Sequence, residues 1–223
     1  MRLEFRVRNS SVNETLDRKA KESLWTNSQY FIGLLGEPRE EGNRLVFPLK
    51  NLPLAGFHIR YDIEKKFLGK IYVMVLEGKF VWQKTFNTSE KIELRYSGFF
   101  KKGRPFFIPV PSKKEGDNGN VVLRLLNQEE NLIEECGKSD LEFLKIFFDP
   151  REEIGKVQVR PYGGSFIHLL FPPMRYNVML VKDQAELIFS IMENVARLIS
   201  KLSFTTYNGF NSHSLSQPFD SPA

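Results

Sequence analysis

Basic and aromatic side chains alternate along one glycine- and proline-rich stretch of the chain. Phe99, Phe100, Phe106 and Phe107 lie among five basic residues, Lys101, Lys102, Arg104, Lys113 and Lys114. Cations bind phosphates and aromatic rings stack on bases, so this stretch is a candidate site for an anion or a nucleic acid. Most charge runs are solvated loops, however, and acidic residues lie close by. Nucleic acid is therefore not the favoured partner.

A second group of polar side chains consists of ligand-binding candidates on expected strands and turns. His58, Arg60 and Asp62 alternate with apolar residues and so share one face of a strand. Arg160 precedes the sequence Pro-Tyr-Gly-Gly-Ser, in which consecutive glycine amides can face an anion, although a hairpin turn is the simpler interpretation. Two prolines precede Arg175 and Tyr176, which are candidates to face a ligand beside a sheet edge.

The sequence predicts neither a metal site nor a cofactor. The three histidines, His58, His168 and His213, are scattered and show no ligand spacing. An aspartate–histidine pair can serve acyl transfer, but no GxSxG motif supplies a nucleophile. Cys136 has acidic neighbours, which raise a thiol pKa and argue against a catalytic thiolate.

A single cysteine excludes an intrachain disulfide, so we expect a protein of the reducing cytoplasm. Residues 1–9 do not resemble a signal peptide. The longest nearly apolar stretch, residues 71–76, is far shorter than the ~20 residues that cross a bilayer, so no membrane span is expected.

The elements that must position these residues are predicted from hydrophobic periodicity and capping signals. Alternation predicts a strand at residues 2–8, and capping-box residues Ser11 and Glu14 predict a helix at 12–25. A short helix at 29–35, ending at Gly36, should follow. We then expect a run of antiparallel strands at residues 44–49, 57–63, 70–76, 80–86 and 91–96, with a turn at 77–79.

The second half of the chain is expected to begin with a hairpin-like excursion at residues 98–120. A strand at 121–126 and a helix at 139–148, opened by the capping box Ser139 and Glu142, should follow. Further strands are predicted at 156–160 and 166–171. A long helix at 183–202 shows the clearest helical spacing, and residues 203–223 lack periodicity.

Charge is unevenly distributed along the chain. Residues 44–111 carry thirteen Lys and Arg against five Asp and Glu, whereas residues 112–155 carry six against eleven. The strand run is therefore basic and the following segment acidic, so one copy can pair with another through these surfaces. The order of expected elements resembles that of helix-grip proteins, whose curved sheet wraps a helix around an apolar cavity; the likeness is one of topology.

These patterns predict an α+β fold, with one mostly antiparallel curved sheet of seven to nine strands and a long C-terminal helix packed across one face. We expect a single domain at 1–202, with 98–150 as an excursion or insertion and 203–223 as a tail with little independent structure. The favoured function is non-catalytic binding of a small apolar or anionic ligand, in a sheet-and-helix cavity or on a basic sheet face. The alternatives are an enzyme whose site uses scattered residues, such as His58, Arg60, Asp62 and Arg160, and an assembly protein that pairs basic and acidic surfaces.

Overall fold

The computed structural model describes residues 2–49, 53–66, 69–82, 90–97, 103–110, 120–139, 141–149, 151, 153–161, 165–167, 180 and 182–210. The helices within them are α1 (Arg2–Leu35), α2 (Val121–Gln128), α3 (Glu130–Lys138) and α4 (Lys182–Phe210). The strands are β1 (Arg39–Glu41), β2 (Arg44–Phe47), β3 (Gly56–Lys66), β4 (Gly69–Val81), β5 (Lys91–Tyr96), β6 (Pro105–Pro109), β7 (Leu141–Phe148), β8 (Ile154–Pro161) and β9 (Ser165–Ile167).

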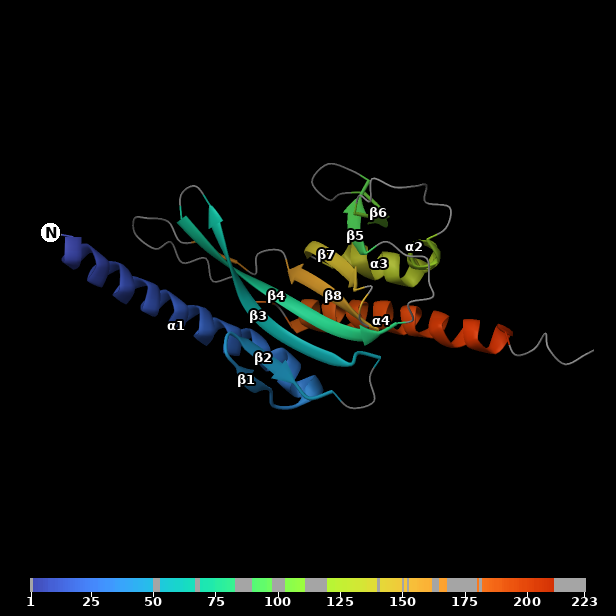
Figure 1. The fold of residues 1–223 in the computed structure, drawn as a ribbon, viewed down its shortest axis with the longest axis horizontal. Helices are drawn as coiled ribbons and strands as arrows, with labels where there is room; N and C mark the ends of the chain where they lie inside the picture. Colours follow the sequence, from blue (N-terminus) through green and yellow to red (C-terminus); the bar gives the residue numbers. More distant parts are fainter. Residues whose placement is uncertain are drawn as a thin grey trace, which may run out of the picture.

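All of these strands belong to one antiparallel sheet. Its order is β1-β2-β3-β4-β8-β7-β5-β6, and β9 pairs with residues 71–73 of β4, whereas β8 pairs with residues 76–81. The long strands β3 and β4 twist across the molecule, and α4 runs across the sheet (Figure 1). The predicted α+β fold with one curved antiparallel sheet and a C-terminal helix packed across it is confirmed.

The helices pack on one face of the sheet, which we call the core face. Helix α1 contacts β2 and β3, α4 contacts β4 and β8, and both α2 and α3 contact β6. Four phenylalanine rings join these layers: Phe57 of β3 lies 5.2 Å from Phe31 of α1 and 5.2 Å from Phe189 of α4, measured between ring centroids, and 5.5 Å from Phe47 of β2. Because successive strand side chains alternate in direction, the polar residues of β3 lie on the opposite side, which we call the outer face.

The N-terminal strand predicted at residues 2–8 is wrong, because these residues begin α1. The helices predicted at 12–25 and 29–35 are parts of the same helix, so the box formed by Ser11 and Glu14 lies inside it. A helix satisfies its backbone hydrogen bonds within the same segment. A strand, even one with three alternating apolar residues, needs a neighbouring strand to satisfy them. The predicted end is confirmed: Gly36 has a φ of +87° and donates its N–H to the Ile32 carbonyl at 2.9 Å.

The strands predicted at 44–49, 57–63, 70–76 and 91–96 are confirmed as β2, β3, β4 and β5. The turn at 77–79 is wrong, because β4 continues to Val81 and takes in the start of the strand predicted at 80–86. A Cβ on Gly78 would lie 2.8 Å from Cδ2 of Leu54 and 3.0 Å from Cε of Met192. The glycine therefore allows close packing against the strand rather than a change of chain direction. Residues 83–86 lie outside the described residues.

The predictions for residues 121–126 and 139–148 exchange helix and strand. Residues 121–126 belong to α2, whose N-cap Asn120 accepts a hydrogen bond from Leu123 N at 2.9 Å. Residues 141–148 form β7, and Leu144, Ile146 and Phe148 alternate inward. Ser139 does not open a helix, because its hydroxyl donates to the Cys136 carbonyl at 2.9 Å and so closes α3.

The excursion predicted at 98–120 contains β6, which pairs with β5 as a hairpin. The strand predicted at 156–160 is confirmed as β8, and the next begins as β9. Both pair antiparallel with β4 and so run in the same direction, which shows that the hairpin turn expected between them is wrong. The helix predicted at 183–202 is confirmed, but it continues to Phe210, so the first part of the expected tail is helical.

Candidate functional site

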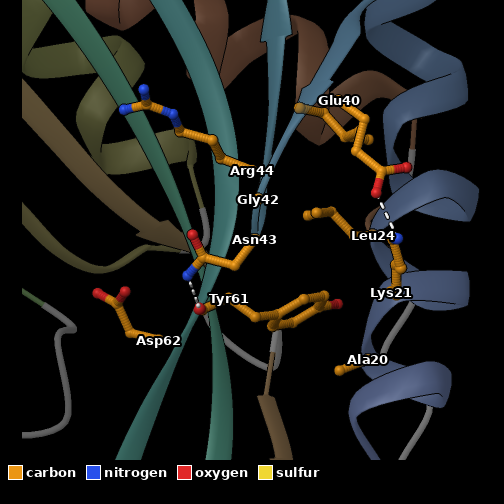
Figure 2. A pocket seen from close by; sticks show the side chains of 10 residues that line it. Ala20, Lys21, Leu24, Glu40, Gly42, Asn43, Arg44, Tyr61 and Asp62 are labelled. Atoms are coloured by element: carbon orange, nitrogen blue, oxygen red, sulfur yellow. Dashed lines mark hydrogen bonds and ion pairs between the residues drawn. The ribbon is translucent and has the colours of Figure 1, made fainter.

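A pocket of about 510 Å³ opens between α1 and the β1–β2–β3 end of the sheet (Figure 2). Three segments that are far apart in the sequence line it. The residues that line it are Ala20, Lys21 and Leu24 of α1, then Glu40, Gly42, Asn43, Arg44 and Leu45 of the β1–β2 hairpin, and finally Tyr61 and Asp62 of β3. The pocket therefore depends on the packing of the helix against the hairpin and β3.

The hairpin ends before β3 does, and this difference in length forms the pocket. Strand β2 pairs with β3 only as far as Arg44 opposite Arg60, so Tyr61 lies beyond the paired region. The Asn43 side-chain amide donates to the Tyr61 carbonyl at 3.4 Å and so occupies part of this edge. Gly42 turns the chain with a φ of +64°, a conformation that side chains rarely adopt.

Apolar and polar groups occupy different sides of the pocket. The Tyr61 ring points toward α1, where Leu24 and Ala20 lie, whereas Arg44 and Asp62 point away from the helix (Figure 2). The Tyr61 hydroxyl lies 3.1 Å from Oγ of Ser23. Burial raises the pKa of Tyr61, so its hydroxyl stays protonated and acts as a neutral hydrogen-bonding group.

Each charged group of the pocket already has a partner of opposite charge. Lys21 forms an ion pair with Glu40, and the hydrogen bond from Lys21 lowers the pKa of that carboxyl. Arg44 pairs with Glu41 at 2.9 Å. Asp62 accepts a hydrogen bond from Arg60 at 2.5 Å. The pocket thus presents balanced charge around an apolar wall.

A polar cluster lies next to the pocket on the outer face and centres on Glu77, which is 7% exposed. Gln158 donates to Glu77 at 2.7 Å, Nη2 of Arg60 lies 3.8 Å from the carboxylate, and Nε2 of His58 lies 3.9 Å from it. Burial lowers the pKa of His58. The charge of Glu77 acts to raise this pKa, and the charges of Arg44, Arg60 and Lys79 act to lower it further. The imidazole is therefore neutral near pH 7.

The structure brings together three of the predicted ligand-binding residues: His58, Arg60 and Asp62. Arg160 lies further along the outer face of β8, where its Nε is 3.0 Å from Oε2 of Glu142. Arg104 is exposed and lies 3.9 Å from Glu130. The other predicted residues fall outside the described part of the chain: Lys101, Lys102, Lys113, Lys114, Arg175 and Tyr176.

We did not identify Lys21, Asn43 and Tyr61 as site residues from the sequence. Lys21 looks like any charged residue of a helix, and Tyr61 alternates with Phe57 and Ile59 as a core residue does. Gly42-Asn43 is a usable signal, because these residue types favour a tight turn between strands. The contact of this turn region with α1 depends on tertiary packing, which the local sequence does not show.

The described residues hold no group of three or more His, Cys, Asp or Glu side chains placed to bind a metal ion. Cys136 is buried, and burial together with the charge of Glu135 raises its pKa to about 12. It is therefore a poor nucleophile. In the part of the chain that the structure describes, each helix is too short or too polar to cross a membrane.

The comparison with protein families gives one match, to proteins of unknown function designated DUF3156, over residues 31–199. No curated protein and no solved structure matches the chain. The matched region holds the hairpin and β3 sides of the pocket and the whole outer polar cluster, whereas Ala20, Lys21 and Leu24 precede it. Since the match covers more than half of its residues, the chain belongs to DUF3156, a family of proteins of unknown function.

Proposed function

We propose that this protein binds a small organic molecule, without catalysis, in the pocket between α1 and the β1–β2–β3 end of the sheet. The observation that carries the proposal is the pocket itself, which has a volume of about 510 Å³ and is lined by residues of three segments. Small-molecule sites in proteins commonly have volumes of about 300–1,000 Å³ and combine apolar walls with a few polar groups. The pocket has both properties.

The chemistry of the lining favours binding over catalysis. An active nucleophile needs a base within hydrogen-bond reach, and acid–base catalysis needs a group that titrates near the working pH. The pKa of Glu40 is lowered and that of Tyr61 is raised, so both shifts lead away from neutrality. His58 belongs to the neighbouring cluster, is 5% exposed and does not line this pocket.

The class of ligand follows from the apolar and charged residues that line the pocket. Leu24, Leu45 and the Tyr61 ring offer an apolar wall, and two cations, Lys21 and Arg44, are matched by two anions, Glu40 and Asp62. Since these charges are already paired, a charged ligand would have to disrupt an ion pair in order to bind. We therefore infer an uncharged ligand with an apolar body and one or two hydrogen-bonding groups.

Native mass spectrometry of freshly purified protein tests the proposal, together with titration of the neutral fluorescent dye Nile red. Ala20→Phe places a ring in the pocket and should abolish both a copurified mass and dye binding. Glu22→Phe adds the same ring at an exposed position of α1, where the Glu22 side chain is 66% exposed, and should leave binding unchanged. Both variants should keep the helical circular dichroism of the wild-type protein.

Three results would refute this function: no dye binding and no bound mass in the wild-type protein, equal losses in the two variants, or full binding in Ala20→Phe. An enzyme and an assembly protein remain alternatives without a specific observation in their favour. A cytoplasmic location stays a prediction.

A further inference from the structure

The outer face of the sheet carries a second candidate site, away from the pocket, over β4, β8, β7 and β5. Residues paired directly across an antiparallel sheet project from the same face. Pairing of Lys79 with Lys156, Lys156 with Phe147, and Phe147 with Lys91 therefore places these four side chains in one row. With neighbouring strands about 4.8 Å apart, this cationic row spans about 14 Å.

A hollow of about 600 Å³ lies along three members of this row, Lys91, Phe147 and Lys156. Arg151 and Gln158 also line it, together with two carboxylates, Glu90 and Asp149. Among the described residues, Lys79 and Lys156 have no ion-pair partner, although they stand directly opposite each other. Like charges in such a position destabilise a sheet. An anion bound between them would offset this repulsion.

Aromatic rings lie among the cations. Lys91 Nζ is 5.6 Å from the centroid of the Phe147 ring, and Lys145 Nζ is 4.1 Å from that of Phe143. Phe106 of β6 is opposite Arg95 on the same face and is 38% exposed. Each ring therefore has a cation over it or directly opposite it. A flat base that displaces the lysine from a ring face would have its phosphate near positive charge.

One group of charges on this face has more cations than carboxylates. Glu93 is surrounded by three cations, Lys91 at 2.7 Å, Arg95 at 2.9 Å and Lys145 at 3.8 Å. Burial acts to raise the pKa of Glu93, but these cations outweigh it and hold the pKa below its usual value. One ionised carboxylate thus meets three cations in this group.

We propose that this outer-face site binds single-stranded nucleic acid, with phosphates on the cationic row and bases on the phenylalanine rings. Charge complementarity requires an anionic partner, and rings that alternate with cations on an open sheet suit a chain of alternating phosphates and bases. An anionic membrane suits this face less well, because peripheral membrane binding buries an apolar face that is separate from the charged one. Here the rings lie among the cations. The proposal does not depend on the ligand pocket.

Fluorescence anisotropy with a labelled oligothymidylate tests the site. With three phosphate contacts, a plot of the logarithm of the affinity against the logarithm of the salt concentration should have a slope of about −2. The affinity should therefore fall about 20-fold between about 50 and about 200 mM salt. The double reversal Lys79→Glu/Lys156→Glu should weaken binding at least tenfold and flatten the slope. Phe147→Leu keeps an apolar side chain but removes the ring, and should weaken binding about fivefold or more.

The matched control is Lys138→Glu/Lys182→Glu, which changes the net charge equally but lies on α3 and α4, where both lysines are exposed. It should retain most of the affinity, and melting temperatures would confirm that all variants fold. The proposal is overturned if the wild-type protein does not bind at low salt, if the two double reversals lose equal affinity, or if Phe147→Leu binds normally. It is also overturned if phosphatidylserine vesicles bind and oligothymidylate does not.

Discussion

Replacing Gly155 with alanine tests the close contact between β8 and β4. A Cβ at this position would lie 2.3 Å from both Cε2 and Cζ of Phe80 and 3.1 Å from Cδ2 of the same ring. Real Cβ atoms do not approach other heavy atoms so closely, so the ring or the strand must move. Phe80 is fully buried, and its ring packs 5.8 Å from that of Phe148, which leaves little room for movement.

The expected cost follows from overpacking of a filled core. Forcing an extra methyl group into such a site typically destabilises a protein by about 1–3 kcal/mol. For a chain of this size, each kcal/mol lowers the melting temperature by about 2–4 °C. Gly155→Ala should therefore lower the melting temperature by about 2–12 °C, measured by circular dichroism or calorimetry.

Gly33→Ala is the matched control, because an added Cβ there has no heavy atom within 4 Å. Gly33 lies in α1, so alanine should stabilise the helix by up to about 1 kcal/mol. Phe80→Leu removes the clashing ring atoms, and the double variant with Gly155→Ala should be at least about 1 kcal/mol more stable than the sum of the single effects predicts. An unchanged or raised melting temperature in Gly155→Ala, or simple additivity in the double variant, would refute the packing argument.

Two further predictions concern buried titratable groups. Because the pKa of Cys136 is raised to about 12, its thiol should react with Ellman's reagent near neutral pH far more slowly in the native protein than after urea unfolding, and equal rates would contradict the burial. Burial lowers the pKa of His58 in the folded state, so as the pH falls the imidazole is protonated in the unfolded chain before it is protonated in the folded protein. The contribution of His58 to the free energy of unfolding is therefore complete above about pH 6.5 and decreases as the pH falls toward the folded pKa. His58→Gln should weaken the loss of stability between about pH 6.5 and 5 in urea titrations, and an identical pH dependence in the two proteins would show that His58 is not the group responsible.

Elements with a strong local pattern were predictable from the sequence. The helical spacing of Ile188, Ile191 and Val195 predicted α4, and all three side chains are buried. The alternation of Phe57, Ile59 and Tyr61 with polar residues predicted β3 and its two faces. In both elements the residues facing the core are set by the period of the element itself.

The errors occurred where a local signal has two physical meanings. Gly78 resembles a turn residue, yet its missing Cβ makes room for Leu54 and Met192, which the neighbouring sequence does not reveal. Ser139 resembles an N-cap, yet it closes the preceding helix. Mostly apolar runs such as residues 121–126 and 141–148 fit a helix or a strand equally well, and only their neighbours in the fold decide between the two.

The candidate site was predictable only in part, for the same reason. His58, Arg60 and Asp62 were grouped correctly because they share a face of one strand. Glu77 and Gln158 join that cluster through strand pairing, which no local pattern shows. The α1 side of the pocket depends on how the helix packs against β2 and β3.

The proposed ligand pocket can be tested most directly through the two tryptophans of the chain, which have different positions relative to it. The Trp25 indole donates to Glu40, a residue of the pocket, at 3.4 Å, whereas Trp82 packs against Phe148 in the core, with ring centroids 5.0 Å apart. In protein carrying ¹⁵N-labelled tryptophan, titration with Nile red should shift the Trp25 indole signal in step with dye fluorescence and leave that of Trp82 in place. Dye binding that leaves the Trp25 signal unmoved, or moves only that of Trp82, would contradict the location of the site.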